Sequence, residues 1–221
     1  MSSDAHVPGL AHHWDSHEQQ QEASFFGMWV FLVTEIMFFG GLFTAYVVYR
    51  TAHQEAFALA SNQLSIAWGA FNTAVLIGSS LTMALAVWAA ASSRRKMLVT
   101  CLLLTVLLGS GFLGVKAIEY SHKFHEHLVP GAAFDASHFP IEMAESAHMF
   151  FNLYFLMTGL HALHMVIGIG LLLWLVVLSW RGRFTPENHN FVEGVGLYWH
   201  FVDIVWIFLF PLLYLLGRGS V

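Results

Sequence analysis

The sequence predicts an all-α protein, an integral membrane bundle of five transmembrane helices. Of its 221 residues, 57% are hydrophobic and only 10% are charged, whereas an average soluble domain has about 25% charged residues. The apolar residues are also gathered into long stretches, and a stretch of about 20 residues is enough to cross a hydrocarbon core. These two observations exclude a water-soluble fold.

The chain is expected to consist of a polar tail and one transmembrane domain. Residues 1–24 are polar and contain four histidines before residue 18, which is typical of a solvated cytoplasmic tail. No cleavable signal peptide is expected there, because residues 1–22 contain no Lys or Arg and no apolar centre. The transmembrane domain is expected over 25–217, with spans near 26–49, 65–91, 98–121, 147–180 and 192–216.

The loops between these spans differ in their positive charge, which predicts the orientation in the membrane. Five basic residues fall on the N-terminal side of the bundle, and three fall on the opposite side. The five are Arg94, Arg95, Lys96, Arg181 and Arg183, and the three are Arg50, Lys123 and Arg218. The sequence therefore predicts a membrane protein with a cytoplasmic N-terminus and an external C-terminus.

Charge and cysteine content exclude several functions. The net charge of −5 and the scattered basic residues give no electrostatic surface for nucleic acid. Cys101 is the only cysteine, so no internal disulfide and no cysteine-based metal site is expected. A nucleophilic triad, a phosphate-binding glycine loop and a dinucleotide-binding motif are not found in the sequence.

Ionisable residues inside the apolar spans are the main candidates for a functional site. His200 and Asp203 are three residues apart, so a helix places both on one face. An ionisable group at this depth costs at least ~2.5–3.5 kcal/mol, and such groups need partners. At a rise of about 1.5 Å per residue, polar residues of three helices lie at a similar depth in the membrane. We expect them to hydrogen-bond to one another across the helices as a buried belt. The belt consists of Glu35, His161, His164, His200 and Asp203.

A second polar cluster is expected toward the external end of the third and fourth spans. Lys116 and Glu119 are three residues apart and are expected to neutralise each other. Glu119-x-x-His122 and Glu145-x-x-His148 are expected to lie at the solvated membrane edge. Glu193 stands at the opposite, inner end of the fifth span.

Two cofactor sites are alternatives to this structural interpretation. The Glu-x-x-His pairs with Glu35 and Glu193 supply the ligand types of a di-iron bundle, but the rise per residue puts Glu193 about 25–30 Å from the pairs. Haem could be held between His161 or His164 and His200. A proton or small-ion transporter using Glu35 and Asp203 is a third alternative, although no inverted repeat is visible. We favour the structural interpretation over these three alternatives: the imidazoles are expected to form hydrogen bonds within the bundle.

The polar motifs resemble those of one known family, subunit III of the haem-copper respiratory oxidases, in its short five-helix bacterial form. The matching segments are 32–39 with Glu35, 158–164 with His161 and His164, and 198–206 with His200 and Asp203; 114–120 and Glu193 also fit. Longer members of that family carry two further N-terminal helices. The resemblance covers nearly the whole chain.

This resemblance implies an accessory subunit without a redox centre. It implies docking against subunit I, which holds the haems and copper, association with subunit II, and phospholipids bound in a cleft. It also implies stabilisation of the catalytic subunit and support of proton uptake, so that the oxidase activity belongs to the complex. Glu35 matches the family's carbodiimide-reactive glutamate, and its expected role is structural or lipid-facing. Cytochrome c is the expected electron donor; quinol oxidases and nitric oxide reductases are the alternatives.

Overall fold

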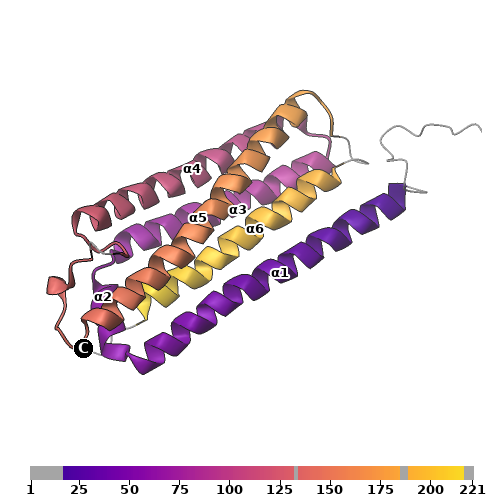
Figure 1. The fold of residues 1–221 in the computed structure, drawn as a ribbon. Helices are drawn as coiled ribbons and strands as arrows, with labels where there is room; N and C mark the ends of the chain where they lie inside the picture. Colours follow the sequence, from indigo (N-terminus) through magenta and orange to yellow (C-terminus); the bar gives the residue numbers. More distant parts are fainter. Residues whose placement is uncertain (1–16, 132–133, 185–188, 217–221) are drawn as a thin grey trace, which may run out of the picture. The chain divides into compact units, whose positions relative to one another are not determined.

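The computed structural model describes residues 17–131, 134–184 and 189–216, which form helices joined by loops and contain no strand (Figure 1). Five helices in this part of the chain are long and apolar enough to cross a membrane: α1 (His17–Ala52), α3 (Ile66–Ala91), α4 (Arg95–His125), α5 (Ala144–Trp180) and α6 (Asn190–Phe210). The predicted all-α fold with five spans is therefore confirmed. Residues 1–16 of the expected polar tail lie outside the described residues, and α1 begins at His17.

The chain divides into two compact units, Met1–Phe38 and Phe39–Val221, with the boundary inside α1. The first contains the described residues of α1 up to Phe38. In the second, α3 packs against α4 and α6, and α5 packs against the same two helices, which closes a ring of four (Figure 1). A short helix that was not expected, α2 (Gln54–Asn62), packs against α5.

The ends of α3, α4 and α5 share one backbone motif. After α5, Gly182 has a φ of 70°, its N–H donates to the Ser179 carbonyl, and the Arg183 N–H donates to Leu178. This is the Schellman arrangement, which satisfies carbonyls left over in the last turn. Ser93 and His127 occupy the same left-handed position after α3 and α4. The short loop after α3 follows from this stop, because α4 begins at Arg95.

Small residues bring α4 and α5 close to the indole of Trp199, which α6 inserts between them. A Cβ atom at Gly109 would lie 2.7 Å from Trp199 Cη2, and one at Gly168 would lie 2.9 Å from Trp199 Cζ3. Trp199 is fully buried, and its Nε1–H donates to Ser79 Oγ at 3.1 Å. Only glycine leaves room for this ring, so these two positions allow the close approach of helices that small residues provide in membrane bundles.

Candidate functional site

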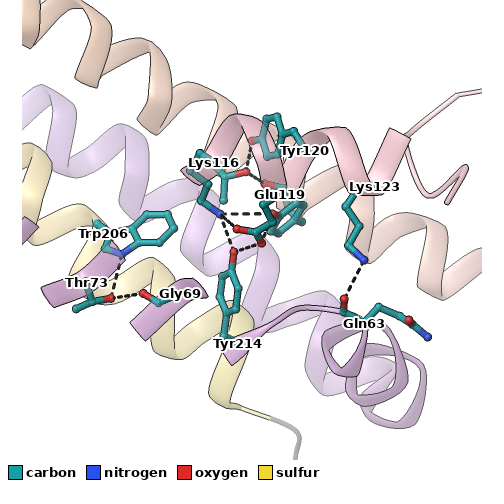
Figure 2. A network of polar contacts seen from close by, with 11 residues as sticks. Gln63, Gly69, Thr73, Lys116, Glu119, Tyr120, Lys123, Trp206 and Tyr214 are labelled. Atoms are coloured by element: carbon teal, nitrogen blue, oxygen red, sulfur yellow. Dashed lines mark hydrogen bonds and ion pairs between the residues drawn. The ribbon is translucent and has the colours of Figure 1, made fainter. Parts of the chain in front are cut away.

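A buried ion pair on α4 is the centre of the most extensive polar network in the described part of the chain. Lys116 Nζ lies 2.9 Å from Glu119 Oε2, and the two side chains are each 6% exposed (Figure 2). This pairing confirms the prediction from their spacing. Burial differs from the prediction: the solvated membrane-edge position expected for Glu119 is wrong, because neighbouring helices cover its carboxyl group.

Two tyrosines from other helices complete the network. Lys116 Nζ donates to Tyr214 Oη at 2.6 Å and to Tyr154 Oη at 3.4 Å. Both phenol hydroxyls then donate to the other oxygen of the carboxylate, Glu119 Oε1, from Tyr154 at 2.9 Å. Each oxygen of Glu119 thus has a donor, and the four side chains join α4 to α5 and to the end of α6. The geometry neutralises both charges inside the protein.

The backbone after α6 explains why Tyr214 can reach this network. Pro211 ends the regular α-helix, and Pro211–Leu215 (η2) forms one π-helical turn that closes with the Leu216 N–H donating to the Pro211 carbonyl at 3.0 Å. Proline lacks the N–H that a continuing helix needs. The wider turn places the Tyr214 hydroxyl beside Lys116, as Figure 2 shows. Arg50, near the end of α1, donates to the Leu216 carbonyl at 2.8 Å and holds this turn.

Aromatic rings surround the ammonium group of Lys116. Nζ lies 4.7 Å from the centroid of Trp206 and 5.2 Å from that of Tyr214. Cations are attracted to aromatic faces, and the attraction grows when water is excluded. The Trp206 Nε1–H itself donates to Thr73 Oγ1 of α3 at 3.1 Å, which connects the network to the fourth helix of the ring (Figure 2).

The remaining residues of the predicted second cluster lie elsewhere. His148 packs on Phe134 with ring centroids 4.5 Å apart. Glu193 pairs with His189 at 3.1 Å near the start of α6. Glu193 is 21 residues before Tyr214 along α6 and η2, or about 30 Å at the rise of a helix. The structure therefore brings together Lys116 and Glu119, but neither His148 nor Glu193 joins them.

The residues of the predicted belt are placed at different helix interfaces. His161 is 1% exposed, and its ring packs against Phe112 and Trp206, with centroids 5.4 and 5.3 Å away. Neither ring nitrogen of His161 has a hydrogen-bond partner among the described residues. The mutual hydrogen bonding expected of the belt is therefore not found at His161, and the apolar and aromatic surroundings hold this imidazole by packing alone.

On α6, His200 and Asp203 face α3. His200 Nδ1 and Ser80 Oγ are 2.7 Å apart and share a hydrogen bond. Asp203 is 3% exposed, and within the described residues neither carboxyl oxygen makes a hydrogen bond of regular geometry. His200 therefore contacts α3, whereas His161 packs against Phe112 of α4 and Trp206 of α6.

His164 and Glu35 complete the predicted belt. His164 Nδ1 lies 2.8 Å from the Leu160 carbonyl of its own helix, and the Tyr198 hydroxyl donates to the His164 carbonyl at 2.9 Å. Glu35 lies in the unit that ends at Phe38.

Hydroxyl residues of α3 are the functional partners that sequence reasoning missed. Three residues of α3 form hydrogen bonds with polar groups of α6. The pairs are Ser79 with Trp199, Ser80 with His200 and Thr73 with Trp206. A buried indole N–H needs an acceptor, and α3 carries four small hydroxyls, those of Thr73, Ser79, Ser80 and Thr82. That combination is the signal by which the pairing could have been predicted.

A lysine near the end of α4 connects the bundle to α2, and its removal has a measurable expected cost. Lys123 Nζ donates to the Gln63 carbonyl at 2.8 Å (Figure 2) and pairs with Glu126. We expect Lys123→Met to lower the free energy of unfolding by about 1 kcal/mol, since a hydrogen bond to water replaces only part of this contact. Denaturant titration in detergent micelles measures it, with the exposed Lys96→Met as control. Equal stability of the two variants would contradict the structural role.

Comparison with known proteins gives consistent similarities over nearly the full length. Residues 11–218 match the family model described as cytochrome c oxidase subunit III. The chain is 34% identical to cytochrome c oxidase subunit 3 of Synechocystis sp., covering 98% of this chain and 85% of the relative. It is 30% identical to cytochrome bo(3) ubiquinol oxidase subunit 3 of Pseudomonas aeruginosa, covering 97% of this chain and 94% of the relative. It is 31% identical to quinol oxidase subunit 3 of Bacillus subtilis, covering 88% of this chain and 87% of the relative.

Proposed function

Because this chain belongs to the cytochrome c oxidase subunit III family, we propose that it is the accessory, non-redox subunit of a proton-pumping terminal oxidase that reduces oxygen to water. Membership makes it a membrane subunit of an oxidase complex that associates with other oxidase subunits. The proposed direct partner is subunit I, which would hold the haems and copper, with subunit II also in the complex. The chain itself would carry no redox cofactor, only bound phospholipids.

The observation that carries this proposal is the saturation of the charged network on α4. Lys116 donates to one carboxylate oxygen and both tyrosines, and each oxygen of Glu119 has a donor. Groups that satisfy one another in this way hold helices together and leave no atom for a substrate. Such a rigid bundle suits a scaffold that stabilises the catalytic subunit, holds lipids and supports proton uptake.

Cytochrome c is the proposed electron donor, and quinol is the second candidate. Relatives of both kinds match the chain over most of their length, which supports an oxidase subunit of either type. The purified complex distinguishes them directly: we expect oxygen consumption with reduced cytochrome c, and activity with quinol alone would replace the first candidate. The proposed location is the bacterial inner membrane, with the N-terminus cytoplasmic, in agreement with the five-to-three distribution of basic residues.

The supporting role is tested by purifying the oxidase with and without this chain. We expect equal initial rates of oxygen reduction per haem, followed by faster loss of activity over many turnovers when the chain is missing. A complex carrying Glu35→Ala should start at the wild-type rate, because its role is proposed to be structural or lipid-facing. Immediate loss of activity in a fully assembled Glu35→Ala complex would contradict that role, and equal lifetimes with and without the chain would contradict the scaffold function.

A further inference from the structure

We propose that a groove between α3 and α6 is the docking site for a transmembrane helix of another oxidase subunit, one that presents a hydrogen-bond donor to Asp203. The inference rests on the proposed function, since it requires a partner subunit in the membrane. It goes further by naming the surface and the chemistry of the contact.

The groove has a volume of about 380 Å³ and an almost entirely apolar surface, with Ser80, His200 and Asp203 among its lining residues. Ile77 and Leu81 of α3 form one side, and Ile204 and Ile207 of α6 form the other; all four are between 43% and 62% exposed. These pairs are spaced by four and three residues, so each is a ridge along its helix. A third helix fits between two such ridges.

Beneath the groove lies a carboxyl group whose hydrogen-bonding capacity is largely unused. Asp203 lines the groove and is 3% exposed; the Ser80 hydroxyl lies beside its carboxyl group, but neither oxygen makes a hydrogen bond of regular geometry within the described residues. Its neighbour His200 is already bonded to Ser80. A buried carboxyl group that has only a shared serine hydroxyl beside it is costly in an apolar environment, and a donor arriving from outside the chain would lower that cost.

The depth of Asp203 in the membrane favours a protein helix over a phospholipid as the occupant of the groove. Asp203 is the fourteenth of 26 residues in the span Asn190–Leu215, and Ser80 is the fifteenth of 26 in Ile66–Ala91. Both therefore lie near the middle of a hydrocarbon core about 30 Å thick. Phospholipid headgroups stay at the surface, and acyl chains have no donor. A side chain of a neighbouring helix can supply one at this depth.

Small side chains in the groove allow the close approach that such a helix needs. Ala84 and Ser80 line it, and Ala84 is exposed. Transmembrane helices associate where small residues let backbones come near and where polar groups bond across the interface. The groove supplies both conditions in one place.

Photo-crosslinking in the assembled oxidase identifies the occupant. A photoreactive residue at Ile77 or Ile204 is expected to give an adduct with another oxidase subunit. The control position is Ile118 on α4, which is 50% exposed, as is Ile204. Adducts from Ile77 and Ile204 that contain only lipid, a second copy of this chain, or α1 of the same chain would overturn the proposal.

Substitutions in the groove then test its contribution to assembly. We expect Ala84→Phe to release the chain from the complex at lower detergent concentration, whereas Ala117→Phe, at an exposed alanine of α4, should behave as wild type. Asp203→Leu should weaken the association about tenfold, the value of one hydrogen bond, and Asp203→Asn should retain most of it. Equal release of Ala84→Phe and Ala117→Phe would overturn the docking site alone. Failure of the wild-type chain to copurify with haem-copper subunits would instead overturn the proposed function.

Discussion

Glu119→Leu is expected to destabilise the bundle by about 3–5 kcal/mol, because it leaves the buried ammonium group of Lys116 without its carboxylate. The substitution also removes the acceptor of two hydroxyls, those of Tyr154 and Tyr214. Water cannot replace the lost contacts, since Lys116 and Glu119 lie between packed helices. The free energy of unfolding is measured by denaturant titration of the purified chain in micelles.

The double variant Lys116→Met with Glu119→Leu is the matched control. Replacing both partners of a buried ion pair by apolar residues is often nearly neutral, whereas removing one partner is not. We therefore expect the double variant to recover more than half of the stability lost in Glu119→Leu. If the stability lost in the double variant equals the sum of the losses in Lys116→Met and Glu119→Leu, the two charges do not depend on each other.

Gly168→Val is expected to lower the free energy of unfolding by about 1–3 kcal/mol through overpacking. A Cβ at this position would lie 2.9 Å from Trp199 Cζ3 and 3.2 Å from Tyr198 Cε1. Both rings come from α6, and Trp199 is held by its bond to Ser79. The ring cannot move aside without breaking that hydrogen bond, so the helices must separate.

Gly170 on the same helix provides the comparison, because a Cβ there would meet no atom within 4 Å. We expect Gly170→Val to unfold at nearly the wild-type denaturant concentration. Trp199→Phe in the Gly168→Val background should restore part of the stability, since a smaller ring leaves space. Equal destabilisation by Gly168→Val and Gly170→Val would point to helix propensity and away from a clash with Trp199.

The sequence predicted the helices well because their signals are local. Run length and hydropathy located five spans, and the spacing of Lys116 and Glu119 predicted their ion pair. Some helices extend beyond the predicted spans. One of them is α4, which begins at Arg95 and ends at His125, where 98–121 was expected. Polar residues continue a helix past the membrane, so hydropathy alone underestimates its length.

The candidate site was predicted less completely, because depth along a helix does not tell which way a side chain points. His161 and Asp203 were expected at similar depths, yet His161 faces Phe112 and Trp206 whereas Asp203 faces α3. Tyr214 was missed for another reason: it reaches Lys116 from the π-helical turn after Pro211, and run length and hydropathy do not predict such a turn. Helix rotation and local irregularity are set by tertiary packing.

The placement of Lys116 and Glu119 one turn apart on the same helix has a consequence for biosynthesis. During translation α4 leaves the ribosome before Tyr154 and Tyr214 have been made, so those hydroxyls cannot assist its entry into lipid. The opposite charges already neighbour each other within the nascent segment. The segment can therefore partition into the bilayer as a neutral unit, and the later helices need only close around it.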